Sequence, residues 1–215
     1  MAMEIVDLTH TISETMPFFP GTEPPGISDP YTIAVNGFAE KGLRLLSHTG
    51  THVDAPCHLL AGAPTLDELG IGHFYGPGWV ADVSHVRGRH IGIADLQKEE
   101  TRIAAVDFLL IHSGWERLWG EAEYFGAYPV LSAEAARWLS GFRLKGVGVD
   151  MVSLDEVDST SLEVHRALLA KHIVLVENLA SLESLIGREF VFSCLPLKIA
   201  TADGSPVRAV AIVKD

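Results

Sequence analysis

Four residues able to bind a metal ion or to move protons lie within eleven positions: His48, His52, Asp54 and His58. They belong to the segment His48-Thr-Gly-Thr-His-Val-Asp-Ala-Pro-Cys-His58 and include three of the ten histidines in the 215-residue chain. Imidazole and carboxylate ligands bind zinc at about 2.0–2.2 Å, so all ligands of one ion must converge on it. This density of ligands predicts a metal site rather than three unrelated histidines in a surface loop.

The spacing of these residues is incompatible with a single regular element. A straight strand would separate His48 from His52 by roughly 13 Å, at about 3.3 Å per residue. A helix would bring the two histidines together but would turn Asp54 away from them. Gly50 readily adopts the backbone conformations that curl a chain, and Pro56 interrupts strand pairing. We therefore expect a folded loop that aims both histidines and the aspartate at one point.

A site with three protein ligands keeps an open position for water, which is typical of catalytic metal centres. His58 is either a further ligand or an unligated imidazole, whose pKa near 6.5 suits general acid/base catalysis. Cys57 could serve as a soft ligand, although free cysteine more commonly packs as a small apolar residue.

The same residues allow a second interpretation, a non-haem iron oxygenase. His52-Val-Asp54 is also the His-x-Asp half of a facial triad, which His165 or His172 would complete. This interpretation leaves the other two histidines of the segment without a role, whereas a hydrolytic site uses all four residues. We therefore favour a hydrolase. A metal-stabilised binding protein without turnover is a third class.

The rest of the chain alternates between short apolar runs and helical patterns. Residues 107–112 are almost continuously apolar, which is typical of a strand covered on both faces. Ser132 can cap a helix that runs to Leu139 and ends at Gly141. Further strands are expected at 4–9, 43–47, 78–83, 146–150, 172–177, 189–195 and 207–213, with a helix at 161–171, a helical turn at 65–68 and a loop at 16–25. This order predicts a single α/β domain with a mixed sheet over residues 1–215.

Composition excludes several classes of partner. Acidic residues outnumber basic ones by 28 to 16, and no lysine or arginine cluster could neutralise several phosphates, so we expect no nucleic-acid partner. Two cysteines, Cys57 and Cys194, do not make a disulfide framework. The N-terminus lacks a signal-peptide pattern, and no uncharged apolar run approaches the ~20 residues that cross a bilayer. We expect a soluble cytoplasmic protein with no membrane partner.

Residues 48–58 closely resemble the signature of the cyclase family of metal-dependent hydrolases, which includes bacterial kynurenine formamidases and isatin hydrolases. Residues 150–159, 195–198 and 203–208 are similar to other segments of that family, so the likeness covers nearly the whole chain. The resemblance implies a swivelling β/β/α domain, one or two zinc or manganese ions per chain, and a homodimer.

The resemblance also implies roles for individual residues. Asp54 and Glu177 would bridge two ions, and His58 would be the proton donor and acceptor. The implied metal ligands are His48, His52, Asp54, His165 and Glu177.

The implied activity is hydrolysis of a small amide, either an aryl formamide resembling N-formylkynurenine or a cyclic amide. Metal-activated water would attack the carbonyl, and His58 would pass a proton to the departing nitrogen. The formamidase branch usually has Trp-Pro-Gly-Asp near its N-terminus, where this chain has Phe19-Pro-Gly-Thr22. Phe19 keeps an aromatic face but lacks the indole N–H, and we expect Phe18 or Phe19 to line the substrate pocket.

Overall fold

The structure, a computed structural model, describes residues 3–86 and 90–214 of the chain. Residues 1–2, 87–89 and 215, which belong to the predicted 1–215 domain, lie outside the described residues. The strands are β1 (Met3–Asp7), β2 (Gly26–Tyr31), β3 (Glu40–Arg44), β4 (His52–Asp54), β5 (Tyr75–Asp82), β6 (Phe108–His112), β7 (Gly146–Val149), β8 (Val174–Glu177), β9 (Phe190–Ser193), β10 (Gly204–Pro206) and β11 (Val210–Lys214). The α-helices are α1 (Ile33–Asn36), α2 (Ile93–Leu96), α3 (Glu100–Ile103), α4 (Ala133–Leu139) and α5 (Glu163–Leu169).

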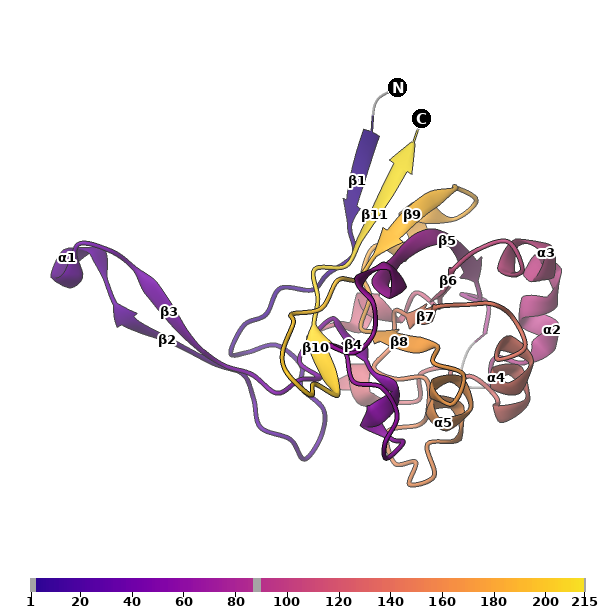
Figure 1. Ribbon diagram of the computed structural model, residues 1–215, viewed down its shortest axis with the longest axis horizontal. Helices are drawn as coiled ribbons and strands as arrows, with labels where there is room; N and C mark the ends of the chain where they lie inside the picture. The colour runs from indigo at the N-terminus through magenta and orange to yellow at the C-terminus, as the bar shows by residue number, and fades with distance from the viewer. Residues whose placement is uncertain (1–2, 87–89, 215) are drawn as a thin grey trace.

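Nine of these strands form one sheet in the order β1-β11-β9-β5-β6-β7-β8-β4-β10. Strands β5 to β8 are parallel and form its centre, while antiparallel strands flank them on both sides. Helices α2, α3, α4 and α5 lie along one flank of the sheet (Figure 1). The predicted α/β class with a mixed sheet is therefore confirmed.

Strand β6 explains how the sheet is stabilised. All five of its residues are buried, as the apolar run predicted. Leu109 and Ile111 pack in the cluster that includes residues of α4 and α5, whereas Phe108 and Leu110 pack in a second cluster with β9 and β11. Successive side chains of a strand point to opposite faces, so a hydrophobic core on each face accounts for the continuous pattern.

Helix α4 follows the predicted signals at its start but not at its end. The Ser132 side chain accepts a hydrogen bond from the main-chain N–H of Ala135 at 3.0 Å. The C-cap is Ser140 in a right-handed conformation, so Gly141 does not end the helix as predicted. Helix α5 is shorter than the predicted 161–171, because Leu162 adopts a left-handed conformation immediately before it.

The structure differs most from the prediction at residues 26–44. Strands β2 and β3 form a separate two-stranded sheet, and α1 connects them at the tip of an arm that projects from the body (Figure 1). The predicted strand at 43–47 is wrong in its bounds and in its place, since β3 ends at Arg44 and is no part of the main sheet. The side chains of Leu43 and Leu46 are exposed.

The described helices are short, with seven residues in each of the longest, α4 and α5. None of the helices within the described ranges has the length and hydropathy needed to cross a membrane.

Candidate metal centre

The segment 48–58 combines a turn with a short strand. Gly50 adopts a φ of +64° and curls the chain, as predicted. The expectation of an irregular loop throughout is wrong for His52–Asp54, because these residues form β4 and pair with both β8 and β10. Successive side chains of β4 point to opposite faces of the sheet, so His52 and Asp54 share one face and Val53 is buried on the other. The turn at Gly50 then returns His48 to the same face.

Strand β8 and helix α5 bring the distant residues to this face. Glu177, the last residue of β8, lies directly opposite His52 in the antiparallel β4–β8 pair. His165 of α5 places its Nε2 3.2 Å from Glu177 Oε1 and 3.7 Å from Asp54 Oδ2. Residues more than a hundred positions apart in sequence are thus joined by strand pairing and helix packing.

All five predicted ligands fall into two overlapping groups. In one group, ligand atoms of His48, His52 and Asp54 lie within 4.8 Å of one another. In the other, ligand atoms of Asp54, His165 and Glu177 meet the same limit. Asp54 is common to both groups, which is the arrangement that a bridging carboxylate requires.

Hydrogen bonds determine which ring nitrogen His52 and His165 can offer to a metal ion. The Nδ1 of His52 donates to the Gly50 carbonyl at 2.7 Å, since a carbonyl can only accept. The Nδ1 of His165 is held by Asp155 Oδ2 at 2.6 Å. In both rings Nε2 is then the nitrogen left to bind a cation, and it faces the carboxylates. Metal-binding histidines are typically oriented in this way, by a carbonyl or carboxylate on the other nitrogen.

His48 lies between two carboxylates. Its Nδ1 is 2.8 Å from Asp54 Oδ1, and its Nε2 is 3.1 Å from Asp203 Oδ2. A Cβ added to Gly204 would lie 2.6 Å from the His48 ring, so only glycine leaves room for this ring. Asp203 was not predicted as a site residue, because an aspartate 155 positions from His48 carries no local signal.

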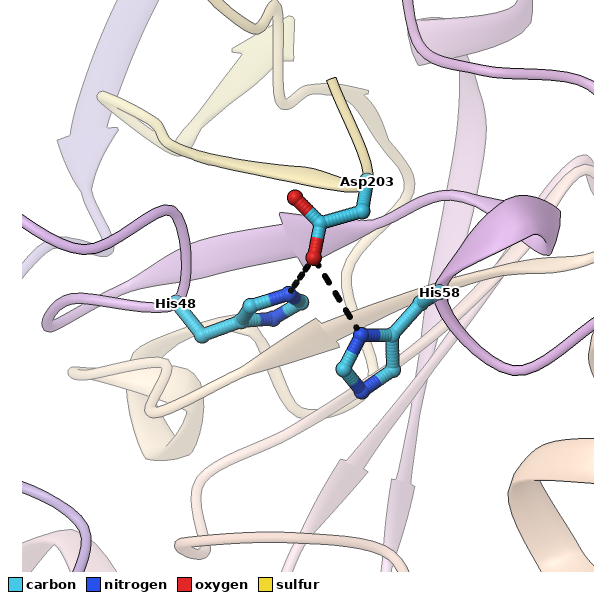
Figure 2. Close-up of side chains that lie close together, drawn as sticks. All are labelled: His48, His58 and Asp203. Atoms are coloured by element: carbon cyan, nitrogen blue, oxygen red, sulfur yellow. Dashed lines mark hydrogen bonds and ion pairs between the residues drawn. The ribbon is translucent and has the colours of Figure 1, made fainter. Parts of the chain in front are cut away.

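Asp203 also approaches His58, the last residue of a short 3-10 helix, η1 (Pro56–His58). Figure 2 shows the Asp203 carboxylate above both imidazoles, with His58 Nδ1 3.5 Å from Asp203 Oδ2. The His48 and His58 rings are 4.1 Å apart between centroids. His48, His58 and Asp203 thus form a further group whose ligand atoms lie within 4.8 Å of one another.

Carboxylates and imidazoles face one another at the centre of the site. Asp54 and Glu177 are buried, and within the described chain their ionic partners are imidazoles rather than lysine or arginine. Burial alone would raise the pKa of Asp54, but His48 and His52 hold it well below its usual range. Burial lowers the pKa of His165, yet Asp155, Glu177 and Asp54 raise it to about 10. Two buried carboxylates with imidazole Nε2 atoms aimed at them form a donor set that fits a divalent cation.

A cavity of about 450 Å³ opens onto this cluster. Phe18 and Phe19, both predicted to line the pocket, lie in its wall and remain about two-fifths exposed at 41% and 42%. Trp119, Tyr124 and Phe125 extend the aromatic lining. The cavity can therefore accept a flat aromatic group next to the candidate metal ligands.

Two residues considered from the sequence lie elsewhere. His172 is exposed at the opposite end of β8 from Glu177, where its carbonyl accepts a hydrogen bond from His73. It cannot complete a facial triad with His52 and Asp54. Cys57 directs its thiol to the Ala202 carbonyl, and burial raises the pKa of that thiol.

A separate group, His112, Glu116 and Asp150, also has ligand atoms within 4.8 Å of one another, with His112 and Asp150 buried and Glu116 half-buried. Asp150 accepts hydrogen bonds from the main-chain and side-chain donors of Ser113 and from the main-chain N–H of Gly114. Burial lowers the pKa of His112, but Asp150 raises it above the usual value. The carboxylate is thus already occupied in holding the turn after β6.

Comparison with known proteins agrees with this geometry. Residues 6–156 match the family model named Cyclase. The chain is 32% identical to a kynurenine formamidase of Bacillus cytotoxicus over 211 residues, which cover 97% of both chains. It is similar to the solved structure of isatin hydrolase A from Ralstonia solanacearum, with a TM-score of 0.88, 26% identity, and coverage of 99% of this chain and 92% of that one. An isatin hydrolase bound to the product analogue thioisatinate has the same fold, with a TM-score of 0.89 over 99% of this chain and 93% of that one, at 21% identity. The chain belongs to the cyclase family.

Proposed function

We propose that this protein is a metal-dependent hydrolase that cleaves a non-peptide C–N bond in an aryl formamide or a cyclic amide. One observation carries the proposal: Asp54 belongs to two groups of metal ligands at the base of an aromatic-lined cavity. The similarity to a kynurenine formamidase and to an isatin hydrolase supports the same reaction class, since both act on amides of aromatic compounds.

The proposed ligands of one ion are His48, His52 and Asp54, and those of a second ion are Asp54, His165 and Glu177. Glu177 is proposed as a second bridging carboxylate, since its Oε2 lies 3.5 Å from His52 Nε2. Zinc and manganese suit this mixture of imidazole and carboxylate groups. A divalent cation in such a site polarises a carbonyl and lowers the pKa of a water molecule from about 15.7 toward 7.

His58 is proposed as the proton carrier. Its ring lines the cavity beside His48, and its Nδ1 faces Asp203. Burial lowers the pKa of His58, and the nearby His48 and His165 act in the same direction against Asp54 and Asp203. A neutral imidazole at pH 7 can accept a proton from water and then donate it to the departing nitrogen.

The assay that tests this proposal uses protein loaded with zinc or with manganese. We expect hydrolysis of at least one substrate among formanilide, N-formylkynurenine and isatin, and loss of that activity on chelation. An enzyme that hydrolyses none of them with either metal would contradict the proposal. Iron-dependent oxygen consumption would support the oxygenase instead, and tight metal binding without turnover would indicate a binding protein.

We also propose that the protein forms a homodimer through the arm, residues 26–44. Ile33, Val35 and Phe38 are 72%, 83% and 51% exposed on this arm, although an isolated two-stranded hairpin is at best marginally stable in water. The accessible surface of 10620 Å² exceeds the about 9700 Å² expected for a compact 23.3-kDa monomer.

Light scattering after size exclusion tests the dimer. The native protein should have twice the mass of the chain. Val35→Asp combined with Phe38→Asp should yield a monomer, whereas Ile71→Asp, an equally exposed position on the body, should leave the mass unchanged. A monomeric native protein would contradict the proposal.

A further inference from the structure

Asn178, the residue after Glu177, connects several parts of the candidate site. It is buried and adopts a left-handed backbone conformation with a φ of +57°. Its main-chain N–H donates to the Met151 carbonyl at 3.0 Å, and its own carbonyl accepts the Thr51 hydroxyl at 2.6 Å. Asparagine tolerates this conformation better than most residues with a side chain.

The side-chain amide of Asn178 reaches the metal-ligand turn. Its Nδ2 donates to the Gly50 carbonyl at 3.0 Å, and the same carbonyl accepts the Nδ1–H of His52 at 2.7 Å. The Gly50 carbonyl is therefore held from one side by an amide that cannot rotate freely. Because this carbonyl selects the tautomer and direction of His52, Asn178 acts on His52 through it.

The other end of the amide reaches the cavity wall. The Tyr124 hydroxyl donates to Asn178 Oδ1 at 2.7 Å, and this tyrosine is almost completely buried. The Tyr124 ring packs edge-on against Trp119, with 5.2 Å between centroids. Both aromatic residues line the cavity.

A second set of contacts connects the aromatic wall to Asn178 through His10 and Thr51. Trp119 stacks on His10 with ring centroids 3.9 Å apart and an interplanar angle of 5°. The main-chain N–H of His10 donates to the Thr51 hydroxyl at 3.0 Å, and that hydroxyl donates to the Asn178 carbonyl. The aromatic wall and the turn that carries His52 are thus joined at Asn178 from two directions.

We infer that Asn178 is a positioning residue that fixes the direction of the His52 Nε2 atom and links this ligand to the aromatic wall of the cavity. The position needs a side chain that donates and accepts at once, on a backbone with positive φ. Asparagine meets both demands, whereas glycine meets only the second and alanine neither. The inference rests on the proposed metal centre, since it assigns a role toward one of the proposed ligands.

The test compares Asn178→Gly and Tyr124→Phe with the native protein. Asn178→Gly keeps the backbone conformation accessible and removes both amide hydrogen bonds. Tyr124→Phe keeps the ring and removes only the hydroxyl that orients the amide. His172→Gly is the matched control, because His172 also has a φ of +57° but lies at the far end of β8.

Zinc affinity is measured by competition with a chelator, and the Co²⁺-substituted proteins are compared by visible absorption. We expect Asn178→Gly to bind zinc about 10–100-fold more weakly, the range found when partners of ligating histidines are removed. Its Co²⁺ spectrum should change, Tyr124→Phe should show a smaller loss of affinity in the same direction, and His172→Gly should match the native protein in both measurements.

Native affinity and an unchanged Co²⁺ spectrum in Asn178→Gly would overturn the inference while leaving the proposed function intact. If Asn178→Gly does not fold, Tyr124→Phe decides, and native zinc affinity in that variant would equally overturn the inference. Failure of the native protein to bind zinc or manganese would instead contradict the proposed function itself.

Discussion

Asp155 holds His165 at two points: its Oδ2 accepts the main-chain N–H of this histidine at 3.0 Å and the ring Nδ1 at 2.6 Å. The Asp155 Oδ1 also accepts the main-chain N–H of Val164, so the carboxylate is anchored to the start of α5. Burial raises the pKa of Asp155, but its contacts with His165 lower it below the usual value. An ionised, anchored carboxylate thus keeps Nε2 of His165 directed at Asp54 and Glu177.

Asp155→Asn should weaken metal binding by about 10–100-fold, because an amide can present its N–H₂ group to Nδ1 and favour the wrong tautomer. Chelator competition on the purified variant measures this change. Asp158→Asn is the control, since it alters the same charge at an exposed position three residues away. Equal affinities in the two variants would show that Asp155 does not orient the ligand.

Gly204→Ala tests the position of His48. The new methyl group would lie 2.6 Å from the His48 ring, too close for the ring to remain in place. We expect weaker metal binding and lower hydrolytic activity, with a smaller change in thermal stability. Gly72→Ala provides the comparison, because an added Cβ meets no neighbouring atom there. A Gly204→Ala protein with native metal affinity would argue against His48 as a ligand.

His58→Ala separates proton transfer from metal binding. If His58 carries the proton, this variant should lose about 10²–10⁴-fold in kcat and keep its metal content. His85→Ala, a change at an exposed histidine outside the cavity, should leave both quantities unchanged. Elemental analysis alongside the formanilide assay makes the distinction. A His58→Ala protein that has lost its metal would identify His58 as a ligand instead.

His10 should make the folded protein sensitive to mild acid. Burial lowers the pKa of His10 to about 4, although Asp150 acts in the opposite direction. As the pH falls, His10 is therefore protonated near pH 6.5 in the unfolded chain but only near pH 4 in the folded chain. Stability is unaffected by this group above pH 6.5 and falls as the pH drops from 6.5 toward 4.

His10→Phe removes the titration while keeping an aromatic ring against Trp119. Urea unfolding at several pH values should show a shallower loss of stability for this variant between pH 6.5 and 4 than for the native protein. Parallel curves for the two proteins over that range would mean that His10 is not the responsible group.

The sequence supported predictions wherever a local pattern was sufficient. The apolar run at 107–112 predicted a strand with two buried faces, and the spacing around Gly50 predicted that the chain turns to bring His48 toward Asp54. The arm at 26–44 was missed because its apolar side chains, such as Ile33 and Val35, are exposed rather than buried in the core of the main sheet. Asp203 and Asn178 were missed for a different reason. Each contacts residues of the 48–58 segment only because the fold brings distant parts of the chain together, and such a contact leaves no local pattern in the sequence.

One carboxylate, Asp54, belongs to two groups of candidate metal ligands. The most direct test is the metal content of Asp54→Ala, measured by elemental analysis after loading with zinc or manganese and compared with the native protein. We expect this variant, folded by circular dichroism, to retain neither ion and to hydrolyse none of the native substrates. Full retention of a metal ion at native affinity would show that Asp54 is not a ligand shared by both groups.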